Sequence, residues 1–193
     1  MSMNPSLVDL SFPASWRVEV LPARPLILPR RQYIYPAAVE EVERGALELM
    51  VRPEGGESFL ATCALGFASP AVPTGVWACP DAAMLCAVAG GYAYMIDTRA
   101  PERFHQVGYR PVTQVRPLVE AGLLIFASFR SIEAWGAGGR LWQTARLSWE
   151  GVRLGETSAT ELKGWGWDLR TDREVPFTID LATGQHNGGP SFG

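Results

Sequence analysis

Apolar residues at every second position, broken by glycine and proline at short intervals, limit more than any other feature what this chain can fold into. The alternation is clearest in two runs: Leu47, Leu49 and Val51, then Phe59, Ala61, Cys63, Leu65 and Phe67. Side chains on a strand point to alternate faces, so each run predicts a strand with one apolar face. Residues 53–57, Pro-Glu-Gly-Gly-Glu, lie between the runs and predict the turn of a β-hairpin.

Further strands are expected along most of the chain. Continuous apolar runs at residues 84–89 and 123–129 predict strands that are buried on both faces. Shorter strand candidates lie at residues 92–96, 103–107, 112–119, 132–135, 140–147, 152–154 and 177–181. The 20 glycines and 15 prolines favour many short strands over long helices. We therefore expect an all-β or β-dominated single domain over residues 1–193: an antiparallel meander of blade-like sheets, arranged as a sandwich or as an incomplete propeller or barrel.

Two segments depart from this pattern. Residues 1–30 are expected to form an irregular, extended N-terminal segment, because their prolines remove backbone donors and fix φ. Residues 36–44 favour a short helix, since Pro36 suits the first helical position and Gly45 suits the stop. A strand is the alternative there, because Val42 alternates with glutamates on either side.

An internal repeat is legible within residues 84–184, the blade-like repeat region. At an offset of 38, Val88-Ala89 matches Phe126-Ala127, Tyr94 matches Ile132 and Phe104 matches Trp142. Residues 177–184 form a third, partial copy. A repeat near 40 residues that is built from short strands is typical of propeller blades.

Two motifs within this region carry a family resemblance. Residues 134–142, Ala-Trp-Gly-Ala-Gly-Gly-Arg-Leu-Trp, match a pattern of apolar strand, glycine turn and Trp, and residues 179–184, Ile-Asp-Leu-Ala-Thr-Gly, match an Asp-x-x-Thr-Gly turn. Over about residues 84–184 the chain thus resembles the PQQ-type and WD-type β-propeller blade repeats. What the resemblance implies is structural, and neither a cofactor nor a catalytic residue is carried over with it. We expect no cofactor.

Composition and charge exclude several partner classes. Seventeen Lys and Arg against 20 Asp and Glu give a net charge of −3, and no basic stripe of the kind that nucleic acids need is present. No apolar run approaches the ~18 residues of a membrane span, and no leader-like segment begins the sequence. We therefore expect a cytoplasmic protein with neither nucleic-acid nor membrane partners. The three cysteines have apolar neighbours and are expected to be reduced and buried, with no metal site.

The two histidines, His105 and His186, are the candidate catalytic residues. An imidazole titrates near neutral pH and can serve as acid, base or ligand. Neither histidine is accompanied by a nucleophile motif, so structural or solvent-exposed roles are the expectation. A small hydrolase or isomerase that pairs His105 or His186 with a carboxylate is the alternative function.

The segment of residues 163–173 carries the candidate binding surface. Its candidate residues are Trp165, Trp167, Asp168, Arg170, Asp172 and Arg173. Exposed aromatic side chains beside charges are typical of surfaces that bind a protein or a small molecule. The competing interpretation is a loop whose Trp side chains seal the core. The expected function is binding of an unidentified protein or small-molecule partner, and a structural subunit of a homo-oligomer is a further alternative.

Overall fold

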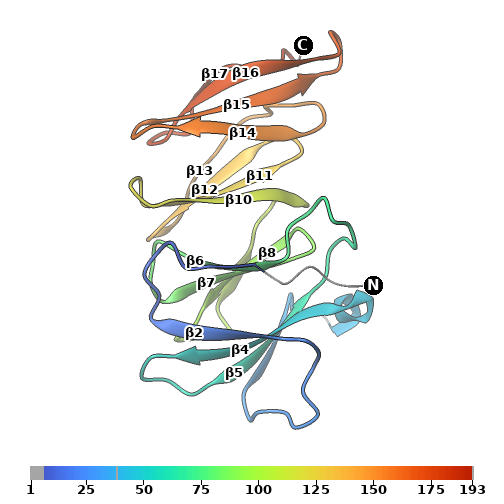
Figure 1. The fold of residues 1–193 in the computed structure, drawn as a ribbon, viewed down its shortest axis with the longest axis vertical. Coiled ribbons are helices and arrows are strands. Elements are labelled where there is room, and N and C mark those ends of the chain that lie inside the picture. Colours follow the sequence, from blue (N-terminus) through green and yellow to red (C-terminus); the bar gives the residue numbers. More distant parts are fainter. Residues whose placement is uncertain (1–6, 38, 193) are drawn as a thin grey trace. The chain divides into compact units, whose positions relative to one another are not determined.

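The chain is all-β in a computed structural model that describes residues 7–37 and 39–192, without the side chains of residues 39–41 (Figure 1). Within these residues it has seventeen strands in four sheets and one short 3-10 helix. The fold class predicted from the alternation is therefore confirmed. The chain divides into two compact units, Met1–Pro111 and Val112–Gly193. That residues 1–193 form a single domain stays a prediction.

The first sheet of unit 1 contains the predicted hairpin. Its strand order is β2 (Trp16–Leu21), β4 (Ala46–Pro53), β5 (Phe59–Ala64) and β3 (Gln32–Tyr35), with β3 parallel to β5. The pairs Val51–Phe59 and Leu47–Cys63 lie opposite one another in the antiparallel β4–β5 ladder, as the hairpin requires. The second strand is shorter than predicted, because it ends at Ala64 and Phe67 is exposed.

The second sheet of unit 1 places β1 (Leu7–Asp9) parallel to β6 (Gly75–Ala78). The strands β7 (Met84–Ala89), β8 (Tyr92–Asp97) and β9 (Phe104–Gln106) continue from β6 as an antiparallel meander. As predicted, β7 is buried on both faces. The two sheets share a core that includes Trp16, Phe59 and Tyr94. Each such side chain stabilises the fold by about 1.5–3 kcal/mol through burial.

Two expectations for the N-terminal part are now decided by the structure. Residues 16–21 are not irregular, because β2 pairs with β4 along its whole length. Pro13 and Pro22 lie just outside this strand, so they delimit it without removing any of its hydrogen bonds. Residues 1–6 lie outside the described part. The short helix favoured for residues 36–44 is present over part of that range as the tighter 3-10 form, since η1 (Val39–Arg44) is a 3-10 helix.

Unit 2 consists of two four-stranded antiparallel meanders. One contains β10 (Val112–Leu118), β11 (Leu123–Ser128), β12 (Ile132–Gly136) and β13 (Gly139–Gln143). The other contains β14 (Val152–Thr157), β15 (Glu161–Asp168), β16 (Arg173–Asp180) and β17 (His186–Gly188). Their core includes Ile132, Trp142 and Phe177. The strand predicted over residues 140–147 ends early at Gln143, and residues 144–151 form a connection to β14.

The internal repeat corresponds to the order of strands within the sheets. The matched segments at an offset of 38 are β7 with β11 and β8 with β12, which are neighbouring strands in equivalent places of their meanders. The third copy, residues 177–184, covers the end of β16 and its turn, and β16 is the strand that follows β15 in the same way. The repeat therefore marks one supersecondary unit, a strand followed by its antiparallel neighbour.

Candidate partner-binding site

The predicted binding segment is a hairpin. Residues 163–168 belong to β15, residues 169–172 form the turn, and Arg173 begins β16. Trp165 and Trp167 share the half-exposed face of β15, while the alternate residues of the strand, including Gly166 between them, are buried. The common direction predicted for the two Trp side chains is therefore correct, but they stand on a paired strand of the sheet and not on a long loop.

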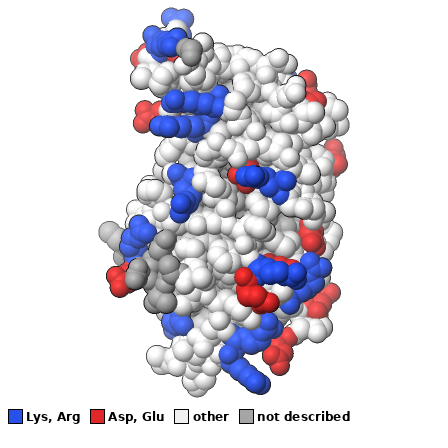
Figure 2. Space-filling model, turned by 180° about the vertical axis from the view of Figure 1, so that it is seen from behind, with Lys and Arg blue, Asp and Glu red and all other residues white. Residues whose placement is uncertain are grey.

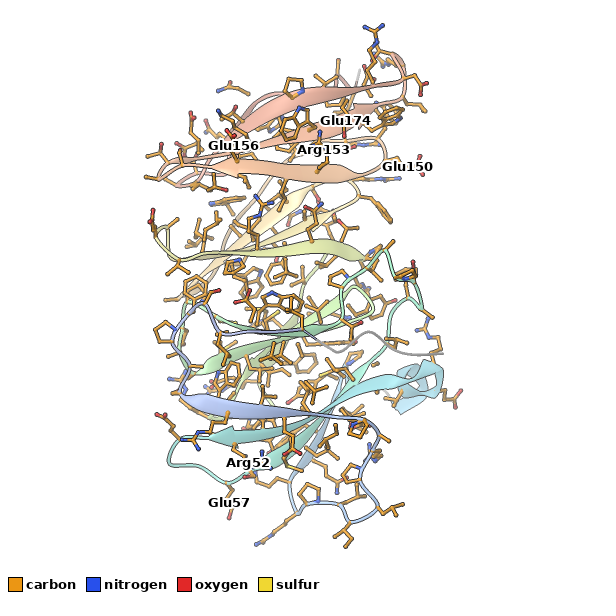
Figure 3. All side chains as sticks on the ribbon, in the orientation of Figure 1. Arg52, Glu57, Glu150, Arg153, Glu156 and Glu174 are labelled. Atoms are coloured by element: carbon orange, nitrogen blue, oxygen red, sulfur yellow. The ribbon has the colours of Figure 1, made fainter. Side chains whose placement is uncertain are left out.

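Trp165 is covered by an ion pair and does not form an open platform. The guanidinium carbon of Arg153 on β14 lies 4.0 Å from the centroid of the Trp165 ring. Arg153 donates two hydrogen bonds to Glu174 on β16, of 2.9 and 2.6 Å, and Figure 3 labels both side chains over these strands. The hydrogen bond from Arg153 lowers the pKa of the Glu174 carboxyl below its ordinary value. This stack ties three strands together, so Trp165 has a structural contact of its own.

Asp168 holds the turn of the hairpin. Its side chain is buried and accepts hydrogen bonds from the backbone N–H of Arg170 at 3.1 Å and from the hydroxyl of Thr171 at 2.9 Å. Such local bonds from an Asp side chain fix a tight turn. Arg170, Asp172 and Arg173 are exposed, and Asp172 has a positive φ of 56°. The turn presents one large apolar side chain to solvent, Leu169, which is 61% exposed.

Leu169 belongs to an open pocket of about 440 Å³ in unit 2. The pocket is lined by residues from three connections: Phe129, Arg130, Arg146, Trp149, Glu150 and Leu169. Phe129 and Arg130 come from the β11–β12 turn, and residues 146–150 come from the connection before β14. Glu150 marks this end of the strands in Figure 3, and Glu156 lies at the opposite end. The pocket therefore gathers at one end of the two meanders.

The segment 146–151 is fixed by hydrogen bonds to β15. The Ser148 hydroxyl donates to the carbonyl of Gly151 at 2.8 Å and accepts from the backbone N–H of Trp167 at 2.8 Å. The backbone N–H of Trp149 donates to the carbonyl of Trp167 at 2.9 Å. Gly166 allows this approach, because a Cβ there would lie 1.8 Å from the carbonyl oxygen of Leu147. The pocket wall is thus anchored on the strand that carries Trp167.

Arg146 packs against two neighbouring aromatic rings, whose centroids lie 5.6 Å apart. Its guanidinium carbon lies 4.2 Å from the centroid of Trp149 and 4.9 Å from that of Phe192. Its Nε donates to the carbonyl of Ser148 at 3.0 Å. Stacking of this kind orients a guanidinium and leaves its outer edge available for hydrogen bonds. Arg146 therefore presents a positioned cation at the pocket.

The charges of the pocket are not neutralised from within. Among the residues that the structure describes, neither Arg130 nor Arg146 forms an ion pair, and neither does Glu150, the acidic residue of the lining. The buried indole Nε1 of Trp149 likewise has no hydrogen-bond partner there. On the face drawn in Figure 2, small groups of Lys and Arg lie beside Asp and Glu between wider stretches of uncharged surface.

None of the six lining residues was among the predicted binding or catalytic residues, although Leu169 lies within the predicted segment. One signal could have found the pocket. The tetrapeptides Ser-Phe-Arg-Ser at residues 128–131 and Asp-Leu-Arg-Thr at residues 168–171 follow the same pattern. Each places an exposed apolar residue and an Arg directly after a strand. The sequence analysis compared the buried strands of the repeat and did not compare the turns.

The histidines are both on edge strands. His105 is exposed on β9 in unit 1, and His186 is half-buried on β17 in unit 2, each on the strand at the edge of its sheet. Neither is among the lining residues. The catalytic alternative that uses His105 or His186 stays a prediction.

The three cysteines are free and buried, as expected from their apolar neighbours. Burial raises the pKa of the Cys63 and Cys79 thiols well above the ordinary value, which keeps both protonated. Across the described residues no group of three or more His, Cys, Asp or Glu could hold a metal ion. The same part of the chain has no helix that is both long and apolar enough to cross a membrane.

Comparisons with known proteins give a distant structural likeness. No protein-family model and no curated protein sequence matches the chain. The solved structures similar to it include the N-terminal domain of Nup159, with 11% sequence identity and a TM-score of 0.37. The match covers 96% of this chain and 53% of the other, so the chain spans about half the length of that structure. The class that the strands define is an all-β protein of small sheets.

Proposed function

We propose that this chain is a binding protein that recognises a segment of a partner protein at the pocket of unit 2. The observation that carries the proposal is the joint exposure of Phe129 (46%) and Leu169 (61%) in one pocket, which Trp149 also lines. Large apolar side chains that gather around a pocket on a soluble surface mark interaction sites. Burial of each against a partner would contribute about 1.5–3 kcal/mol before the cost of association.

The rigidity of the lining supports the same proposal. The turn with Leu169 is held by Asp168, and the wall with Trp149 is held by Ser148. A surface that is already ordered loses little conformational entropy when a partner binds. Asp168, which was predicted to bind, would thus act by positioning Leu169. The binding surface that we propose is centred on the pocket instead of on Trp165.

We also propose that the sheets are propeller blades of the PQQ or WD type. The Asp-x-x-Thr-Gly resemblance is supported by geometry, because Asp180 Oδ1 accepts hydrogen bonds from the backbone N–H of Thr183 at 2.8 Å and from its hydroxyl at 2.7 Å. Gly184 then adopts a positive φ of 72°, which favours glycine at the end of such a turn. Three four-stranded antiparallel meanders, counted in the described residues and without β1, are of the kind from which propellers are built.

The binding proposal can be tested without knowing the partner. A library of random peptides displayed on phage is selected on the purified chain, and the selected peptides are synthesised and titrated by fluorescence anisotropy. The doubly substituted variant Phe129→Asp/Leu169→Asp should lose this binding while its unfolding midpoint stays close to that of the wild type. Leu141→Asp is the matched control, because Leu141 is 59% exposed in the same unit and does not line the pocket. Peptides that bind the double variant as tightly as the wild type would contradict the proposal.

A further inference from the structure

We infer that the group received by this pocket is a carboxylate that the partner carries next to an apolar side chain, so that the partner segment is an acidic peptide. The inference rests on the proposed function and specifies its ligand. It depends on two guanidinium groups in the lining that have no anionic partner among the described residues, those of Arg130 and Arg146, and on the indole of Trp149, whose Nε1–H has no acceptor there.

The first donor is the guanidinium of Arg146. One side of this group is used within the chain, because Nε donates to the Ser148 carbonyl and the guanidinium packs against the rings of Trp149 and Phe192. The Nη atoms carry four N–H groups, and the contact described for them is a long one of 3.5 Å, from Nη2 to the carbonyl of Trp149. A planar guanidinium with a free edge matches the two oxygens of a carboxylate in a bidentate arrangement.

The second donor is Arg130, which lines the same pocket and is exposed. No hydrogen bond or ion pair of its guanidinium is found among the described residues. Two guanidinium groups in one pocket repel one another, and the single carboxylate of the lining, Glu150, pairs with neither within 4 Å. An anion that enters the pocket removes this repulsion, so the pocket prefers a ligand of negative charge.

The third donor is the indole Nε1–H of Trp149, which is buried and has no acceptor among the described residues. A buried donor without a partner is destabilising, and an acceptor supplied by a ligand relieves that cost. Trp149 itself lines the pocket, so a ligand held there lies beside its indole ring. The lining thus combines two cationic side chains, Arg130 and Arg146, with one neutral donor, the indole of Trp149.

The apolar side chains and Glu150 in the lining favour a carboxylate ligand over a phosphate. Phe129, Leu169 and Trp149 make most of the lining apolar, and Glu150 adds a negative charge to it. A phosphate carries up to two charges and would be repelled more strongly by Glu150 than a singly charged carboxylate is. The apolar walls fit a hydrocarbon side chain that lies beside the charged group. A Leu-Glu or Leu-Asp pair in an extended peptide has this combination.

The test follows the indole signal of Trp149 in the ¹⁵N-labelled chain. The signal is assigned by its loss in the variant Trp149→Phe, and the chain is titrated with four probes: acetyl-Leu-Glu-amide, acetyl-Leu-Gln-amide, acetyl-leucine and inorganic phosphate. Acetyl-Leu-Glu-amide should shift the signal in a saturable way, and the Gln probe should bind about tenfold more weakly. Saturable binding of acetyl-leucine would identify a terminal carboxylate as an equally good source of the group. Equal binding of the Glu and Gln probes, binding of phosphate alone, or no shift with any carboxylate would overturn the inference.

Substitutions connect the effect to the pocket. Arg130→Gln should weaken binding of acetyl-Leu-Glu-amide about tenfold, because one charge-assisted donor is lost. Arg140→Gln is the control, since Arg140 is an exposed arginine of the same unit on β13 and does not line the pocket. An unchanged affinity in Arg130→Gln would overturn the assignment of this donor.

If phage-selected peptides depend on Phe129 and Leu169 but contain no Asp or Glu, the carboxylate inference fails while the proposed function stands. If the carboxylate probes bind but selected peptides ignore the pocket, the proposed function fails instead.

Discussion

Phe129 and Leu169 occupy the same position in two hairpins of unit 2, and both lie in one pocket. Each directly follows the last residue of its strand, Ser128 in β11 and Asp168 in β15. The side chain of each preceding residue accepts a hydrogen bond from the backbone N–H two positions on, at 3.3 Å for Ser128 and 3.1 Å for Asp168. The two turns therefore have the same local structure. The polar side chain at the end of the strand accepts a hydrogen bond from the backbone, and the residue after it is exposed to solvent.

The first prediction concerns this turn. Asp168→Ala removes both hydrogen bonds of a buried carboxylate and should lower the free energy of unfolding by about 1–3 kcal/mol. Urea unfolding followed by Trp fluorescence measures the change. Asp172→Asn in the same turn should have little effect, because Asn tolerates the positive φ found at that exposed position. Equal losses in the two variants would show that the Asp168 bonds do not stabilise the turn.

The second prediction concerns the loop between β2 and β3, which extends from its sheet in Figure 1 as a blue segment. Leu26 is 102% exposed and Ile27 is 91% exposed. The double variant Leu26→Ser/Ile27→Ser should therefore change the free energy of unfolding by no more than about 0.5 kcal/mol. Leu49→Ala, at a fully buried position of β4, should cost about 2–5 kcal/mol in the same urea titration. A large loss in the double variant would mean that the loop packs against the chain in solution.

Local periodicity made most of the fold predictable. The alternation at Leu47–Val51 and the buried run at residues 84–89 reflect which face of a strand meets the core, and that choice is made by adjacent residues. The end of β5 at Ala64 was not predictable in this way, since the alternation continues to Phe67 although pairing stops earlier. Strand ends depend on partners that are distant in sequence, and β5 pairs with both β4 and β3.

The pocket was harder to predict than the strands. Phe129, Trp149 and Leu169 come from three separate connections, so the every-second-residue pattern of a strand does not link them. The density of Trp and charge in residues 163–173 drew attention to the hairpin that carries Leu169, but it did not reveal that Arg153 covers Trp165. That stack depends on the register between β14 and β15, which places Arg153 opposite Trp165. Register cannot be read from either strand alone.

The third prediction concerns acid stability at Asp97, where β8 ends. Burial alone would raise the pKa of this carboxyl, but hydrogen bonds from the side chain and backbone of Arg99 and the charge of Arg103 lower it below the ordinary 3.8. A carboxylate with a depressed pKa in the folded state stabilises the fold above its unfolded pKa, and this contribution is lost as the pH falls through the folded value. Asp97→Asn should therefore lower the urea midpoint at about pH 7 and have a smaller effect at about pH 3.

The control for this pH dependence is Asp9→Asn. Asp9 also accepts hydrogen bonds from its own local segment, through Ser11, but it has no ion pair among the described residues. We expect its substitution to change the urea midpoint less than Asp97→Asn does at about pH 7. An Asp97→Asn effect that is equal at both pH values would show that the charge of Asp97 does not contribute to folding.

The fourth prediction separates two glycines of unit 2. A Cβ at Gly166 would lie 1.8 Å from the backbone carbonyl oxygen of Leu147, and a backbone atom cannot move aside as a flexible side chain can. Gly166→Ala should therefore push the connection 146–151 away from β15 and cost about 1–3 kcal/mol of unfolding free energy. Gly138→Ala is the matched control, because nothing lies within 4 Å of a Cβ there.

The same displacement should reach the pocket, since Trp149 bonds to Trp167, the next residue along β15. In the NMR titration Gly166→Ala should weaken binding of acetyl-Leu-Glu-amide even where the chain is fully folded, whereas Gly138→Ala should bind as the wild type does. Wild-type stability and binding in Gly166→Ala would mean that the connection does not rest on this strand.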